Sequence, residues 1–177
     1  MKKIVLHHQI TAALLAAFLA IISPFSLPLG SIPLTLSAFG VHLCALLAGG
    51  WGTVSVGIYL LLGAVGVPVF AGFTGGIHVL TGPTGGFLLG YIPCVLLSGF
   101  LCRRFGDKHP LPWGVALLCG TAVLYVCGIA WLMLSASVSL RAAIIACVLP
   151  FLPGDVVKIV AAVCLAYPVK KALQKFK

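Results

Sequence analysis

The sequence predicts an all-α integral membrane protein, a bundle of six transmembrane helices whose outer loops cap a ligand pocket. Of its 177 residues, 62% are hydrophobic and 7% are charged, and the only acidic residues are Asp107 and Asp155. A soluble chain of this size needs far more charge to cover its surface. Its apolar runs instead approach the roughly 20 residues that span a bilayer. We therefore expect a single transmembrane domain over residues 1–177.

Proline and glycine delimit the first three predicted spans. The first, residues 7–25, follows two lysines and precedes a Pro- and Gly-containing turn at 27–33. We expect it to be retained as a span, because Ser23-Pro24-Phe25 is a poor signal-peptide cleavage site. The second span, 35–48, and the third, 53–67, are joined by an uncharged Gly-Gly-Trp-Gly turn. A glycine-rich stretch follows the third span.

The last three predicted spans are separated by more polar connections. The fourth, 86–102, ends at the most polar segment between spans, 103–112. The fifth, 113–134, leads through a Ser- and Arg-containing connector to a short apolar helix at 142–149, which two prolines then end. The sixth, 153–169, measures about 25 Å at 1.5 Å per residue, which is just long enough to cross.

The basic residues predict how the spans are oriented. If the N-terminus is cytoplasmic, that side collects nine of the eleven Lys and Arg residues, while the outer connections hold only Arg141 and the sixth span holds Lys158. Such a bias places both termini in the cytoplasm. The same distribution argues against nucleic-acid binding despite a net charge of +9, because the basic clusters flank apolar spans instead of forming one patch.

Three connections, residues 27–34, 68–85 and 135–153, are then expected on the outer side. They are rich in Pro, Gly and apolar residues and poor in charge, unlike ordinary solvated loops. Non-helical backbone is tolerated at membrane depth only where protein or a cavity surrounds it. We expect these connections to fold back and line the pocket.

Asp155 and Lys158 are the most informative candidate site residues. They are three residues apart on one predicted helix and so share a face. A charge inside the bilayer costs about 2.5–3.5 kcal/mol on insertion scales, and such residues commonly mark a ligand or ion path. The alternative is a self-neutralising pair that only fixes helix packing.

The glycine-rich stretch supplies the other candidate ligand contacts. A ligand that approaches backbone needs residues without a Cβ, and the alternative is a flexible outer loop. No Gly-Lys dipeptide occurs in the chain, which excludes a Walker ATP site. We expect substrate binding to involve the following residues in addition to the charged pair: Phe73, Gly75, Gly76, Thr84, Gly85 and Gly86.

Small residues recur every fourth position in the first span, at Ala12, Ala16 and Ala20, with Ala13 and Ala17 alongside. Such a row lets another helix approach closely and predicts a partner-docking face, although an Ala-rich span produces it easily by chance. The seven cysteines include no C-x-x-C pair, and His42 and His78 have no companions at metal-ligand spacing. No metal, cofactor or catalytic group is predicted.

Taken together, four segments resemble the BioY family, the biotin-specific S components of energy-coupling-factor (ECF) transporters. They are residues 32–36 (IPLTL), 63–72 (GAVGVPVFAG), 82–86 (GPTGG) and 149–158 (LPFLPGDVVK). The resemblance extends from the first span to the sixth. It implies a multi-pass protein of a prokaryotic cell membrane that binds biotin at its outer face.

The resemblance also implies partners: a transmembrane coupling subunit and two ATP-binding subunits, which would supply the ATPase activity that this chain lacks. The family's D-x-x-K maps onto Asp155 and Lys158, and its A-x-x-x-A docking pattern onto Ala12, Ala16 and Ala20. Aromatic walls for biotin are expected from Phe70, Phe73, Phe87 and Trp113. The alternatives are a membrane structural or assembly subunit, an S component for another small vitamin, and a secondary transporter, for which inverted repeats are not visible.

Overall fold

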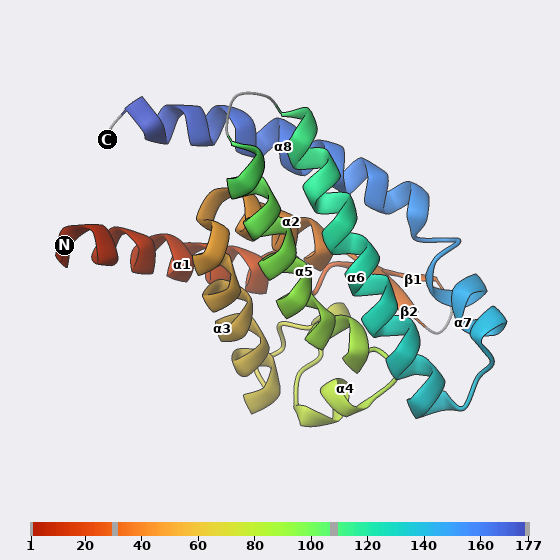
Figure 1. The fold of residues 1–177 in the computed structure, drawn as a ribbon. Helices are drawn as coiled ribbons and strands as arrows, with labels where there is room; N and C mark the ends of the chain where they lie inside the picture. Colours follow the sequence, from red (N-terminus) through yellow and green to blue (C-terminus); the bar gives the residue numbers. More distant parts are fainter. Residues whose placement is uncertain (1, 30–31, 107–109, 176–177) are drawn as a thin grey trace.

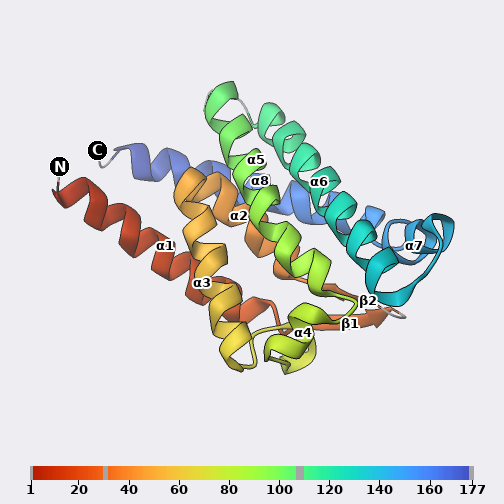
Figure 2. The same ribbon diagram turned by 60° about the horizontal axis from the view of Figure 1, so that its bottom comes forward.

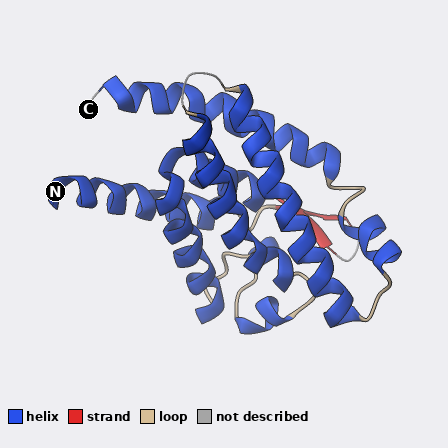
Figure 3. Ribbon diagram, viewed as in Figure 1, coloured by secondary structure: helices blue, strands red, loops and turns tan. Residues whose placement is uncertain are grey.

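The computed structural model describes residues 2–29, 32–106 and 110–175 and consists almost entirely of helices (Figure 3). The elements run in the following order: α1 (Lys2–Ile22), β1 (Ser26–Leu29), β2 (Ile32–Thr35), α2 (Ser37–Ala48), the 3-10 turn η1 (Gly49–Trp51), α3 (Gly52–Val65), the 3-10 turn η2 (Ala71–Phe73), α4 (Ile77–Thr81), α5 (Gly85–Phe105), α6 (Leu111–Ala136), α7 (Leu140–Cys147) and α8 (Leu152–Lys175). The prediction of a helical membrane bundle is confirmed, and the six predicted spans correspond to α1, α2, α3, α5, α6 and α8.

Not every one of these helices is long enough to cross a bilayer alone. In the described ranges, four stretches have the length and hydropathy to do so, namely 37–65, 85–105, 111–136 and 152–172. The first of them comprises α2 and α3, of 12 and 14 residues, which are about 18 and 21 Å long. The chain changes direction between them at η1 (Figure 2).

The connection between α1 and α2 differs from the predicted turn. It forms a two-stranded antiparallel hairpin in which Ser26 is paired with Thr35 and Leu29 with Ile32. Pro28 faces Pro33 across the two strands, which suits a two-stranded sheet because each strand has an edge that needs no N–H donor. The hairpin extends the backbone from α1 toward α7 (Figure 1).

Close packing between α5 and α6 forms the centre of the molecule, where the two helices lie side by side (Figures 1 and 2). Glycines on both helices make this approach possible. A Cβ added to Gly86 would lie 2.1 Å from Cβ of Trp131, and one added to Gly120 would lie 2.0 Å from Oγ of Ser98.

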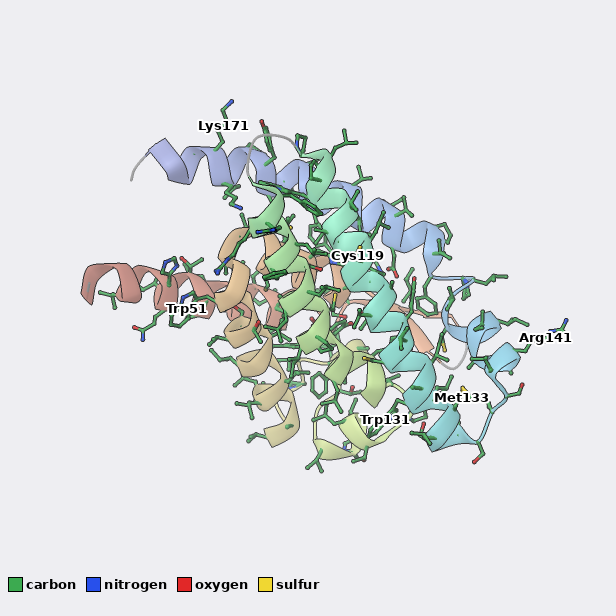
Figure 4. The ribbon with its side chains drawn as sticks, in the orientation of Figure 1. Trp51, Cys119, Trp131, Met133, Arg141 and Lys171 are labelled. Carbon is green, nitrogen blue, oxygen red and sulfur yellow. The ribbon has the colours of Figure 1, made fainter. Side chains whose placement is uncertain are left out.

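The two ends of the bundle differ in character. The start of α1, the end of α8 and the adjoining ends of α5 and α6 lie at one end, and β1, β2, α4 and α7 lie at the other (Figures 1 and 2). Lys171 projects from the first end, and Arg141 projects from the second (Figure 4). The first end is the basic one, and the second holds the pocket described next.

Candidate ligand-binding site

A pocket opens at the end of the bundle that carries the hairpin, α4 and α7. It encloses about 660 Å³ of space not filled by protein atoms, including its open mouth. All three connections that were expected to face outward contribute to its wall. Pro33 comes from the hairpin, Phe70 and Thr84 come from the stretch around α4, and Phe151 follows α7. The prediction that these connections line a pocket is confirmed.

Asp155 and Lys158 lie together in the pocket wall near the start of α8. Lys158 Nζ donates to Asp155 Oδ1 over 2.9 Å, and the side chains are 11% and 9% exposed, respectively. The hydroxyl of Tyr125 on α6 donates to the other carboxylate oxygen over 2.5 Å. The backbone N–H of Asp155 already donates to the carbonyl of Phe151. The carboxylate is therefore held by two side chains rather than by free N–H groups of the helix end.

A second polar row faces the same pocket. The hydroxyls of Ser37 on α2 and Tyr91 on α5 are 2.5 Å apart, and Thr35 at the end of the hairpin is hydrogen-bonded to Ser37. All three residues line the pocket. Hydroxyls both donate and accept, so this row can serve either kind of ligand group. Sequence reasoning missed these residues and Tyr125, because single hydroxyls in apolar helices form no motif.

Aromatic rings supply much of the remaining wall. Phe70, Phe87 and Tyr59 line the pocket, and the Tyr59 and Phe70 rings meet edge to face with centroids 5.5 Å apart. Two other expected wall residues lie elsewhere. Phe73 is 62% exposed and packs against Phe25, and Trp113 lies at the opposite end against Tyr167. Two of the four expected aromatic residues, Phe70 and Phe87, therefore line the pocket.

Among the predicted residues of the glycine-rich stretch, Thr84 lines the pocket and the four glycines do not. The glycines make room for the protein's own chain. A Cβ at Gly75 would lie 2.3 Å from the carbonyl oxygen of Val67, and one at Gly85 would lie 1.8 Å from that of Leu80. Gly76 has φ +106°, a left-handed conformation that glycine adopts without strain. Gly86 faces Trp131 as described above.

The alanines of α1 at positions 12, 16 and 20 were predicted to face a partner, but they face the interior of the bundle. Ala12 and Ala16 are 1% and 2% exposed, on a helix that packs against α2 and α3, and the partly buried Ala20 also packs against this core. Ala12 and Ala16 therefore pack within the chain, and Ala20 does so in part. The neighbouring Ala13 and Ala17 are exposed. In this structure Ala12 and Ala16, assigned to docking from the sequence, therefore face the chain's own core.

Comparison with known proteins shows the family. A model of the BioY family matches residues 1–175. The chain belongs to the BioY family. The biotin transporter BioY of Thermotoga maritima is 38% identical over 164 residues, which cover 92% of this chain and 95% of that protein. The probable biotin transporter BioY of Pyrococcus horikoshii is 37% identical over 155 residues, covering 87% and 90%.

A solved structure supports the same relationship at the level of the fold. The crystal structure of the S-component for biotin from an ECF-type ABC transporter superimposes on this BioY chain with a TM-score of 0.90 and 26% sequence identity. The match covers 97% of this chain and 94% of that one. The similarity therefore extends over nearly the whole fold.

Proposed function

We propose that this chain binds biotin in the pocket around Asp155 and Lys158 and acts as the substrate-specific subunit of an ECF-type vitamin transporter. One observation carries the proposal: an ion pair, 9% and 11% exposed, lies in the wall of a pocket that all three outer connections line. Membership of a family whose named members are biotin transporters identifies the ligand.

The chemistry of the pocket suits biotin. The cyclic urea of biotin has N–H donors for a carboxylate and a carbonyl that accepts from an ammonium. Asp155 and Lys158 offer both groups from adjacent turns of one helix, and Tyr125 orients the carboxylate. The hydroxyls of Ser37 and Tyr91 lie elsewhere in the wall, where they can meet the carboxylate of the valeryl chain. The rings of Phe70 and Phe87 cover the apolar atoms.

Transport on this proposal depends on partners. The sequence has no Walker motif, so the energy comes from ATP-binding subunits that act through a membrane coupling subunit. Docking occurs on the face of α1 that carries Ala13 and Ala17, since these small residues are exposed and permit close helix approach. The basic end of the bundle faces the cytoplasm of a prokaryotic cell, and the pocket faces outward.

Binding of biotin by the purified chain tests the ligand directly. We expect isothermal titration calorimetry in detergent to show saturable binding with one biotin per chain, and mass spectrometry to find biotin copurifying. Desthiobiotin, thiamine and riboflavin are the matched competitors. Binding of another vitamin instead of biotin would identify a different S component, and binding of none would favour a structural subunit.

Reconstitution tests the dependence on partners. Liposomes that contain the chain alone should accumulate no biotin, and liposomes that also contain the coupling and ATP-binding subunits should accumulate it when ATP is supplied. Uptake by the chain alone, driven by an ion gradient, would instead identify a secondary transporter. These results are independent of the binding measurement, because binding requires only the pocket.

A further inference from the structure

The pocket around Asp155 has two polar parts, and only one of them carries charge. In the first part, on α8 and α6, the Asp155 carboxylate accepts from Lys158 over 2.9 Å and from the Tyr125 hydroxyl over 2.5 Å. In the second part, on α2 and α5, the hydroxyl oxygens of Ser37 and Tyr91 are 2.5 Å apart. The two parts therefore offer a ligand different chemistry.

The second part is a row of three hydroxyls, those of Thr35, Ser37 and Tyr91, which we call the hydroxyl row. Ser37 and Tyr91 are only 2% and 5% exposed, so the row is held inside the bundle. Hydrogen bonds run from Thr35 to Ser37 and from Ser37 to Tyr91. These two bonds use two of the three hydroxyl hydrogens, which leaves one hydrogen and several lone pairs for a ligand. The row can thus both donate and accept.

The charges near the pocket are already balanced. In the part of the chain that the structure describes, Lys158 is the one lining residue with a cationic side chain, and it is paired with Asp155. Residues 26–36, which include the hairpin, contain no Lys or Arg. Arg141 is exposed near the start of α7 and projects away from the bundle (Figure 4). A carboxylate held by the hydroxyl row would therefore be buried without a cation of its own.

The two ends of biotin differ in what they require. The cyclic urea has N–H donors and a carbonyl acceptor, which match a carboxylate and an ammonium side by side. Asp155 and Lys158 provide that combination, and the end of the valeryl chain is then left to the hydroxyl row.

Given the proposed function, on which this inference rests, we propose that the hydroxyl row binds the end of the valeryl chain as a neutral hydrogen-bonding group. The ligands of the pocket then include biotin derivatives with an uncharged end, such as the primary amide of biotin. Its carbonyl accepts the free hydrogen of the row, and its NH₂ group donates to a hydroxyl oxygen. A carboxylate makes stronger hydrogen bonds than an amide, but it costs more to bury without a counter-charge. Because these effects oppose each other, the exchange changes affinity little.

Three ligands test the proposal on the purified protein in detergent by titration calorimetry. They are biotin, its primary amide, and an analogue in which a methyl group replaces the carboxyl group. We expect the amide to bind within about fivefold of biotin and the methyl analogue to bind about tenfold more weakly. If a cation instead bound the carboxylate, the amide would lose about tenfold or more, because a charged hydrogen bond would be broken.

Two hydroxyl deletions in the pocket form a matched pair. Tyr91→Phe removes one member of the hydroxyl row and should weaken biotin and the amide about fivefold each, while the methyl analogue stays within about twofold. Tyr125→Phe removes the hydroxyl that holds Asp155 and should weaken all three ligands by the same factor, because all three carry the urea. The contrast between the two variants locates the end of the valeryl chain.

Two results would overturn the proposal while leaving biotin binding intact. The first is a loss of tenfold or more for the amide in the parent protein. The second is an equal effect of Tyr91→Phe on all three ligands, or no effect on any of them, which would place the end of the valeryl chain away from the row. Absence of biotin binding by the parent protein would instead contradict the proposed function itself. If circular dichroism shows that Tyr91→Phe is unfolded, Ser37→Ala replaces it, since that variant removes another hydroxyl of the row.

Discussion

Neutralising one member of the Asp155–Lys158 pair should destabilise the protein, and neutralising both should leave its stability nearly unchanged. The two side chains are 9% and 11% exposed, and their charged atoms are 2.9 Å apart. Asp155→Asn leaves the ammonium of Lys158 without its carboxylate in a largely buried position. Removing one partner of a buried ion pair costs about 3–5 kcal/mol of folding free energy. We expect a cost near the lower value, because the pocket mouth admits water.

The double variant Asp155→Asn/Lys158→Met removes both charges and keeps the side-chain volumes similar. Replacement of a buried pair by uncharged groups is often neutral or stabilising, so its stability should return to within about 1 kcal/mol of the parent protein. Biotin, however, loses two charged hydrogen-bond partners at about 1.5–3 kcal/mol each. Its affinity should fall by about a hundredfold or more.

Two measurements on the same samples decide whether the ion pair binds biotin or only fixes helix packing. Thermal unfolding in detergent should show that the single variant is destabilised and that the double variant is not, and titration calorimetry should show weak or absent biotin binding in both. The stable but non-binding double variant is the informative one, because misfolding cannot explain its loss of affinity. If it binds biotin as tightly as the parent protein, the ion pair only fixes helix packing, and our assignment of the site is wrong.

Three further predictions concern groups that the structure places near or away from the pocket. Tyr125→Phe removes the hydrogen bond to Asp155 and should weaken biotin binding about tenfold without unfolding the protein. Unchanged biotin affinity would contradict this prediction. Tyr167→Phe, at the other end of the bundle, is the control. Gly86→Ala places a Cβ 2.1 Å from the side chain of Trp131 and should cost about 1–3 kcal/mol of stability. The matched Gly57→Ala has nothing within 4 Å of its new Cβ, so a similar cost in both variants would refute the packing argument. Ala16→Trp overpacks a side chain that is 2% exposed and should reduce folding and biotin binding together. Ala17→Trp is on the exposed face and should block complex formation and uptake but spare binding; normal uptake would eliminate docking there.

The sequence predicted best those features that local chemistry determines. Apolar runs and the prolines and glycines between them predicted the helices and identified the three connections that line the pocket. Asp155 and Lys158 were recognisable because charges in apolar helices are costly and therefore rare. Each of these inferences needed only neighbouring residues and the properties of the bilayer.

The features that the sequence did not predict depend on which distant segments meet. Tyr125 contacts Asp155 across 30 positions, and Tyr91 contacts Ser37 across 54. Nothing local distinguishes these hydroxyls from others in apolar helices. The glycines show the same limit in a different way. Their abundance predicted backbone close to a ligand, but Gly75 and Gly85 face the backbone of Val67 and Leu80.

The alanine rows of α1 show why helix orientation in a membrane is hard to predict from one sequence. In water, a polar face identifies the exposed side of a helix. Residues 12–22 of α1 are apolar on all sides, so the row at Ala12 and Ala16 and the row at Ala13 and Ala17 look alike. Only the packing of α1 on α2 and α3 separates them, since it buries the first row and leaves the second exposed beside Leu14 and Phe18. A partner helix that docks on α1 must therefore meet the second row, together with its larger apolar neighbours.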